Sequence, residues 1–444
     1  MPLRLTFLPL LLVALMTLLA APGQSAEWPE FRGPRGQGHS DAQNLPLTWS
    51  ETENIAWKTE LPGKGYSSPV IDGEQIWMTY AIDEPLSEAA KQEKLKSNTG
   101  NQPLQVVGTV HMHAICVNRK TGKIEHDVEL LVERDPQWTH AQNSFASPTP
   151  VLADGKLYCH FGTHGTACLD TQTRQVLWTN TETKIMHENG AGSSPVLVDD
   201  KLIFHCDGSD EQYIVALDAR TGQIAWKTPR SGEMRSDPQL RKAYGTPIVM
   251  DFGGQRSVIS PAADWLYAYD PLTGKEQWKV SYGILGFSNV PRPVAGDGLV
   301  YVSTSFMQPE MQALKVDGVS ATPVIAWRNK KGVPRMSSPL LVGSELYMVS
   351  DNGVASCLDT KTGETLWSQR LGGNFSSSPL FADGRIYVGN REGETFVITP
   401  GREYKLLATN KLDDAIMASP AALDGAIFLR TEKAIYRIEK PKQP

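Results

Sequence analysis

The sequence has few cysteines, no long block of like charge and, beyond residue 21, no long apolar run. No Cys-x-x-Cys spacing joins the five cysteines, and their spread through 444 residues excludes a small disulfide scaffold. The 43 Lys and Arg stand against 49 Asp and Glu, so the net charge of −6 excludes the basic surface typical of nucleic-acid binding. With 40% apolar residues, the chain is expected to fold around a large core.

The first 26 residues are typical of a secretory signal peptide. Arg4 precedes an apolar stretch over residues 5–21, and small and polar residues follow up to Ala26. This order predicts export and cleavage after Ala26. An uncleaved anchor is the alternative, although the run is short for a spanning helix. We therefore expect the periplasm or cell envelope as the location, no transmembrane segment after removal of residues 1–26, and an N-terminal extension over 27–54.

A repeated pattern dominates the rest of the chain. A small residue precedes Pro, an apolar run follows, an Asp/Gly turn comes next, and a second apolar run ends the pattern. The eight prolines are Pro69, Pro150, Pro195, Pro247, Pro293, Pro339, Pro379 and Pro420. A second motif lies about 20 residues further into most units, and 216–226 (Ala-Leu-Asp-Ala-Arg-Thr-Gly-Gln-Ile-Ala-Trp) is its clearest copy.

Each unit is expected to form four short antiparallel strands, because Asp-Gly and Thr-Gly turns between apolar runs are hairpin signals. Four strands per 40–50 residues is the period of a propeller blade. A helical solenoid is excluded because Pro, Gly and β-branched residues recur within every unit. The sequence thus predicts an all-β, eight-bladed propeller over 55–440.

The chain ends supply a further prediction. After Pro420 only three strands remain, whereas Ile55-Ala56-Trp57-Lys58 repeats the fourth-strand sequence of 224–227 before the first unit begins. We expect the N-terminal strand to pair with the last blade and close the ring, since closure removes exposed sheet edges.

The repeated Ala-x-Asp-x-x-Thr-Gly-x-x-x-Trp motif resembles the pyrroloquinoline quinone (PQQ) repeat superfamily over about residues 55–440. One branch contains quinoprotein alcohol and sugar dehydrogenases, which hold PQQ and calcium on the propeller axis. Another contains non-enzymatic propellers like the outer-membrane assembly factor BamB. Residues 28–34 (Trp-Pro-Glu-Phe-Arg-Gly-Pro) resemble the start of exported, BamB-like propellers. The adjacent cysteines of the dehydrogenases are missing here, as is the lipid-anchor cysteine of BamB.

The favoured function is therefore an exported, non-catalytic scaffold that binds protein partners in the cell envelope, as a monomeric propeller without a cofactor. A PQQ- and calcium-dependent alcohol or sugar dehydrogenase is the alternative. A sugar-binding, lectin-like propeller is a third hypothesis. No nucleophile–base arrangement is recognisable in the sequence.

The motif tryptophans are expected to pack between blades, where adjacent sheets diverge. These are Trp57, Trp178, Trp226, Trp278, Trp327 and Trp367. The loops from each fourth strand to the next Pro unit should emerge on one face and form a polar mouth around the axis. The candidate binding residues there are Lys64, His140, Asn143, His187, Asn189, Arg241, Tyr244, Asn289, Arg292, Arg335 and Asn374.

Three smaller features complete the sequence-based expectations. His111 and His113 share one strand face, but no metal-ligand spacing supports a metal site there. Cys159 and Cys168 flank an expected turn, which leaves open a disulfide or two buried free thiols. The insertion over 82–103 in the first blade should carry a short helix within 84–95, where helix formers are dense.

Overall fold

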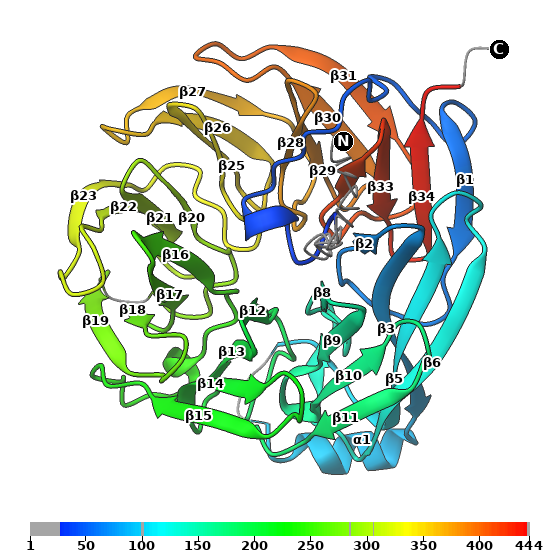
Figure 1. Ribbon diagram of the computed structural model, residues 1–444, viewed down its shortest axis with the longest axis vertical. Helices are drawn as coiled ribbons and strands as arrows, with labels where there is room; N and C mark the ends of the chain where they lie inside the picture. The colour runs from blue at the N-terminus through cyan, green and yellow to red at the C-terminus, as the bar shows by residue number, and fades with distance from the viewer. Residues whose placement is uncertain (1–26, 99–101, 284–285, 305, 442–444) are drawn as a thin grey trace, which may run out of the picture.

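The computed structural model describes residues 27–98, 102–283, 286–304 and 306–441. The predicted signal peptide, residues 1–26, lies outside the described residues. Eight four-stranded antiparallel sheets are arranged around a central axis as the blades of a propeller (Figure 1). This confirms the predicted all-β fold with eight blades of four strands.

In the first seven blades the strands follow one another from the axis outward in chain order. The first four blades are blade 1, β2 (Val70–Asp72), β3 (Gln75–Pro85), β5 (Val107–Asn118) and β6 (Ile124–Arg134); blade 2, β8 (Val151–Ala153), β9 (Lys156–His160), β10 (Thr166–Asp170) and β11 (Val176–Asn180); blade 3, β12 (Val196–Val198), β13 (Lys201–Asp207), β14 (Gln212–Asp218) and β15 (Ile224–Pro229); and blade 4, β16 (Ile248–Phe252), β17 (Gln255–Pro261), β18 (Trp265–Tyr269) and β19 (Glu276–Ser281).

The second half of the ring repeats this arrangement, with one strand supplied from the start of the chain. The blades are blade 5, β20 (Val294–Gly296), β21 (Leu299–Ser303), β22 (Met311–Lys315) and β23 (Val324–Asn329); blade 6, β24 (Leu340–Val342), β25 (Glu345–Val349), β26 (Val354–Asp359) and β27 (Thr365–Arg370); blade 7, β28 (Leu380–Ala382), β29 (Arg385–Gly389), β30 (Glu394–Ile398) and β31 (Leu406–Lys411); and blade 8, β32 (Ala421–Leu423), β33 (Ala426–Arg430), β34 (Ala434–Glu439) and β1 (Ile55–Glu60). β1 pairs antiparallel with β34, from Ile55 opposite Ile438 to Glu60 opposite Ala434.

The insertion in blade 1 combines strand and helix. β3 continues to Pro85, so the first part of the insertion is strand, and α1 covers Glu88–Leu95. The helix begins later than the composition suggests because Ser87 caps it, accepting a hydrogen bond from the Ala90 N–H. A two-stranded sheet of β4 (Leu104–Gln105) and β7 (Thr139–His140) follows.

A chain of buried hydrogen bonds links the blades around the axis. In each bond, the backbone N–H of the residue before a repeat Pro donates to the side-chain hydroxyl of the equivalent residue in the next blade. The seven bonds are Ser68 to Thr149, Thr149 to Ser194, Ser194 to Thr246, Arg292 to Ser338, Ser338 to Ser378, Ser378 to Ser419 and Ser419 to Ser68, at 2.8–3.0 Å. We call this set the hydroxyl ring. Its one interruption lies between Thr246 and Arg292, which has no hydroxyl.

A second contact links neighbouring blades further from the axis. The indole Nε1 of Trp178 donates to the Ala219 carbonyl in the Asp-x-x-Thr-Gly turn of the next blade, at 3.0 Å. A Cβ on Gly222, the last residue of that turn, would lie 2.5 Å from the indole, and Gly222 also has a φ of +74°. The same donation to the next blade is made by Trp57, Trp226, Trp327 and Trp367.

Two substitutions separate the effect of the indole contact on stability from the effect of the positive φ. Gly222→Ala is expected to lower the free energy of unfolding by about 1–3 kcal/mol more than Gly384→Ala, because overpacking against Trp178 adds to the positive-φ strain. Gly384 has a φ of +67° but nothing within 4 Å of its Cβ position. Urea unfolding of both variants checks this, and equal losses would contradict it.

The hydroxyl ring gives a second stability test. Ser194→Ala is expected to cost about 1–3 kcal/mol, because the buried Thr149 N–H loses its acceptor. Ser194→Thr keeps the hydroxyl and should be close to wild type, since Thr149 and Thr246 occupy equivalent positions. Thermal and urea unfolding measure the difference, and an Ala variant as stable as the Thr variant would refute the role of the ring.

Candidate functional site

Strand direction alternates within each blade, so two kinds of connection lie on the same face of the ring. One kind links the outer strand of a blade to the inner strand of the next blade. The other kind is the turn between the second and third strands of a blade. We call this face the loop face and the opposite side, with the Asp-Gly turns, the turn face. Only the first kind of connection was used in the sequence-based choice of candidate residues.

Five of the candidate residues meet where three loops converge on the loop face. The Asn143 amide donates to the Asn189 carbonyl at 2.8 Å, and the His140 N–H donates to the same carbonyl at 3.2 Å. The Tyr244 hydroxyl donates to the His187 carbonyl at 2.9 Å and accepts from the Asn189 amide at 3.1 Å. His187 and Tyr244 are buried. The cluster therefore fixes the loops between blades 1 and 4 to one another.

The other candidates lie apart from this cluster. The Lys64 Nζ donates to the Ala141 carbonyl, Arg241 donates to the Arg235 and Ser236 carbonyls, and Asn374 donates to Glu392. Asn289 is buried and bonds Tyr282, whereas Arg335 lies over the Phe306 ring. The Arg292 side chain bonds Glu30 and Phe31 of the N-terminal extension and so lies inside the ring.

Arg391, which the sequence reasoning missed, is a central group of the loop face. It follows β29 of blade 7 and donates to the Ser376 hydroxyl at 2.7 Å and to Gln142, on the loop after blade 1, at 3.3 Å. Turns between second and third strands also supply Arg430 and Glu432, and Glu432 accepts from the Tyr66 hydroxyl at 2.8 Å. The alternation of strand direction is the signal that could have found them.

Burial shifts the pKa of two groups of this mouth. Burial, with the charges of Arg391 and Lys64, lowers the pKa of His140. Burial also lowers the pKa of Arg430 to about 9, although its Nη1 donates to Ser67 and to the Thr79 carbonyl.

The histidines and cysteines singled out in the sequence have local partners. His111 pairs with Glu129 at 2.8 Å, and His113 pairs with Asp127 at 3.0 Å. Among the described residues, no group of three or more His, Cys, Asp and Glu side chains could hold a metal ion. Cys159 lies opposite Ala167, whereas Cys168 lies opposite Tyr158, so the two thiols point to opposite faces of the sheet and both are free and buried. The disulfide alternative is therefore wrong for this structure.

The N-terminal extension lies over the centre of the ring on the turn face (Figure 1). We call residues 27–50 the axial segment. Trp28 pairs with Ile71 of blade 1, Ser40 donates to Ala422 of blade 8 at 2.7 Å, and His39 bonds the Leu341 carbonyl of blade 6 at 2.6 Å. Because a carbonyl only accepts, the His39 Nε2 carries the proton. Inner strands of blades 1, 2, 5, 6, 7 and 8 contact this segment.

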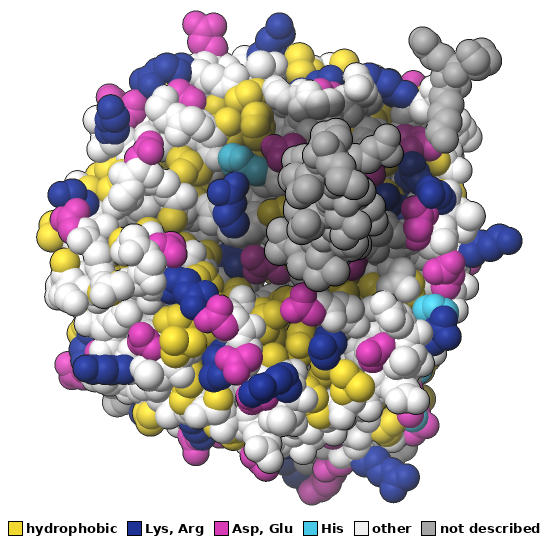
Figure 2. Space-filling model, viewed as in Figure 1, with side chains coloured by type: hydrophobic (Ala, Val, Ile, Leu, Met, Phe, Trp, Pro, Cys, Tyr) yellow, Lys and Arg dark blue, Asp and Glu magenta, His cyan; other side chains and the backbone are white. Residues whose placement is uncertain are grey.

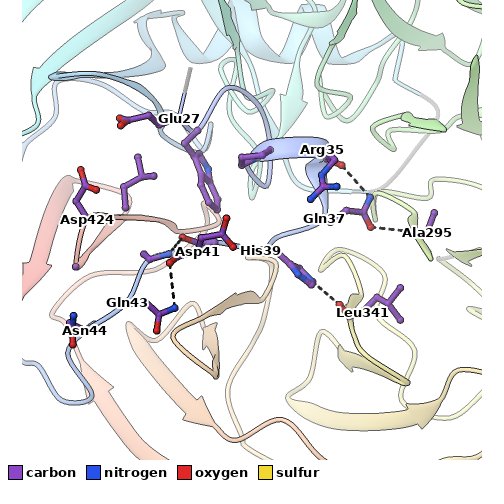
Figure 3. Close-up of a pocket in the computed structure, with 16 residues that line it drawn as sticks. Glu27, Arg35, Gln37, His39, Asp41, Gln43, Asn44, Ala295, Leu341 and Asp424 are labelled. Atoms are coloured by element: carbon purple, nitrogen blue, oxygen red, sulfur yellow. Dashed lines mark hydrogen bonds between the residues drawn. The ribbon is translucent and has the colours of Figure 1, made fainter. Parts of the chain in front are cut away.

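A pocket of about 880 Å³ opens between the axial segment and blades 5, 6 and 8. Glu27 and Asp424 lie on one side of it and Arg35 and Gln37 on the other (Figure 3). Figure 2, which has the same view as Figure 1, shows acidic and basic side chains around the central hollow. The pocket walls carry both signs of charge, as suits a polar ligand.

The fold and the repeated inter-blade contacts define a PQQ-like β-propeller. Over residues 71–260, 195–322 and 262–402 the chain matches the family described as outer membrane protein assembly factor BamB, and it belongs to that family. No helix in the described part of the chain has the length and apolar content needed to cross a membrane.

The chain is similar to proteins of two kinds. BamB of Moranella endobia (strain PCIT) is 22% identical over 253 residues, which are 56% of this chain and 61% of that protein. The chain thus spans less than two thirds of that relative. Tetrathionate hydrolase of Acidithiobacillus ferrooxidans is 20% identical over 435 residues, 91% of this chain and 77% of that protein.

Two solved structures show the same fold. BamB from Moraxella catarrhalis aligns with a TM-score of 0.52 at 14% identity, covering 75% of this chain and 99% of that one. A europium-containing methanol dehydrogenase aligns with a TM-score of 0.62 at 12% identity, covering 92% of this chain and 90% of that one.

The loop-face cluster is expected to lose stability in mild acid. Burial holds the pKa of His187 well below its ordinary value of 6.5. In mild acid this imidazole therefore binds a proton in the unfolded chain but stays neutral in the folded chain. The free energy of unfolding should therefore fall as the pH drops from 7 to 5, by up to about 1.4 kcal/mol per pH unit for this group. His187→Gln should flatten that slope in urea unfolding at both pH values, whereas His111→Gln, at a partly exposed position, should not. An unchanged slope in His187→Gln would contradict the assignment.

Proposed function

We propose that the protein is an exported, non-catalytic propeller that binds protein partners in the cell envelope. The observation that carries this proposal is a rigid ring with an exposed apolar and basic patch on its loop face, in a chain of the BamB family. Its location in the periplasm and its monomeric state are parts of the proposal.

The patch lies on the loops around blade 5. Phe306 and Met307 are 49% and 56% exposed, although both are large apolar side chains. Phe306 contacts Phe287 edge-on, and the Arg335 guanidinium lies 5.7 Å from its ring centroid. Aromatic, Met and Arg side chains are enriched at protein–protein interfaces. These residues form the surface that we assign to a protein partner.

A PQQ-dependent alcohol or sugar dehydrogenase is the second candidate, favoured by the extent of the similarity to a methanol dehydrogenase. The described residues hold no group of three or more His, Cys, Asp or Glu side chains that could hold a metal ion, so no residue is assigned as a calcium ligand. We therefore derive no catalytic step through PQQ.

Capture from native envelopes tests the scaffold. Phe306→Ser with Met307→Ser is expected to reduce cross-linked partner at least tenfold by quantitative mass spectrometry, since buried interface anchors contribute about 2 kcal/mol or more. Val324→Ser is the matched control, because Val324 is 68% exposed on β23 and lies outside the patch. Unchanged capture by the double variant would refute the patch.

The enzymatic alternatives are tested with the same wild-type preparation. PQQ and calcium are added, and quinone absorbance after desalting is measured together with dye reduction by alcohols and sugars. Tetrathionate is included because of the extended alignment with tetrathionate hydrolase. Retained quinone or turnover would favour an enzyme over the scaffold.

A further inference from the structure

One buried guanidinium on the propeller axis has no counter-charge. Arg32, in the axial segment, is 2% exposed. Its Nη2 donates to the Gln37 carbonyl at 3.2 Å. Its Nε and Nη1 have no hydrogen-bond partner among the described residues. A buried charge that is neither paired nor fully hydrogen-bonded lowers the stability of the fold. A hydrogen-bond acceptor at Nε and Nη1 would therefore stabilise this arrangement.

Two other buried arginines, Arg230 and Arg292, each bond a carboxylate. Arg230 bonds both carboxylate oxygens of Asp207, at 2.9 and 2.7 Å, and the Ser260 hydroxyl. Arg292 bonds Glu30 at 2.9 Å together with the Phe31 and Pro247 carbonyls. Arg32 differs from both, because no carboxylate of the described residues bonds it.

A second buried guanidinium, that of Arg292, acts on Arg32. Burial, reinforced by the charge of Arg292, lowers the pKa of Arg32 to about 9. Burial lowers the pKa of His39, and the charges of Arg32 and Arg35 act in the same direction. The one carboxylate that bonds these groups, Glu30, is paired with Arg292. Arg32 is therefore left without a carboxylate partner beside a second buried guanidinium.

The backbone here is built to hold guanidinium groups closely. A Cβ on Gly38 would lie 2.7 Å from the Arg32 Nη2 and 3.1 Å from its Nε, and a Cβ on Gly36 would lie 2.0 Å from the Arg292 Nη1. Two residues that line the 880 Å³ pocket interact with Arg32. The Gln37 carbonyl accepts its hydrogen bond, and the pKa of His39 is lowered by its charge. Arg32 does not itself line this pocket, but it is hydrogen-bonded to Gln37, which does.

We propose that Arg32 is the centre of an anion-binding site on the propeller axis, which takes a small oxyanion or the carboxylate of a small organic acid. The anion accepts hydrogen bonds from Nε and Nη1 and neutralises the buried charge. Charge-assisted hydrogen bonds of this kind are the stronger ones in proteins. The site goes beyond the proposed scaffold role and does not depend on it, because it lies on the turn face.

Thermal unfolding of the full chain tests this site, with sulfate, phosphate, acetate and succinate titrated against chloride at equal ionic strength. Saturable stabilisation beyond chloride is expected, and the preferred anion distinguishes an inorganic oxyanion from an organic acid. Arg32→Gln should weaken the apparent affinity about tenfold or more, since a hydrogen bond to a charged group contributes about 1.5–3 kcal/mol. Arg220→Gln, in an exposed turn of blade 3 and outside the pocket lining, should leave the affinity unchanged.

A second measurement keeps the test decisive if Arg32→Gln fails to fold. Crystals of the wild type grown with selenate should give an anomalous peak within hydrogen-bond distance of the Arg32 Nε or Nη1. Water alone at both nitrogens, stabilisation equal to that by chloride, or unchanged affinity in a folded Arg32→Gln variant would each overturn the proposal.

Discussion

The hydroxyl ring is the constraint on which the rest of the propeller depends. Inner strands converge at the axis, where the residue before each repeat Pro is held extended and its N–H is buried. A buried N–H without an acceptor is costly, and the Pro that follows offers no donor of its own. The hydroxyl of the neighbouring blade resolves this, so each Ser-Pro or Thr-Pro pair couples two blades. The bond from Ser419 to Ser68 couples the last blade to the first in the same way.

The tryptophan contact adds a second point of attachment at larger radius, and blades 1 and 4 depart from it in different ways. His126 occupies the Trp position of blade 1, and the turn that it faces carries Arg174, at φ +64°, where the repeat has Gly. The Arg174 Nε lies 3.1 Å from the His126 Nε2. Trp278 faces blade 5, whose turn lacks Thr-Gly, and its Nε1 has no partner among the described residues. At blade 1 both the indole and the glycine of the contact are thus replaced, whereas blade 4 keeps the indole without the hydrogen bond.

The blades could be predicted from the sequence because their determinants are local: alternating strands, hairpin turns and a recurring period. The mouth could be predicted only in part. His140, Asn143 and Asn189 lie on one kind of connection, whereas Arg391 and Glu432 lie on turns of the other kind. The axial segment could not be placed at all, since its partners are distant along the chain; Ser40 and Ala422, for example, are 382 positions apart. No local pattern encodes which inner strand such a segment meets.

The single interruption of the hydroxyl ring explains why the axis carries charge. Arg292 stands where the other blades have a hydroxyl, so the Thr246 N–H loses its usual acceptor in the ring. The Arg292 guanidinium instead donates hydrogen bonds to the Glu30 carboxylate and the Phe31 carbonyl of the axial segment. Fixing the segment there brings Arg32 beside Arg292, and the only carboxylate that bonds the pair is already taken. The unpaired charge of Arg32 is thus a consequence of how the N-terminal extension is attached, and a bound anion neutralises it.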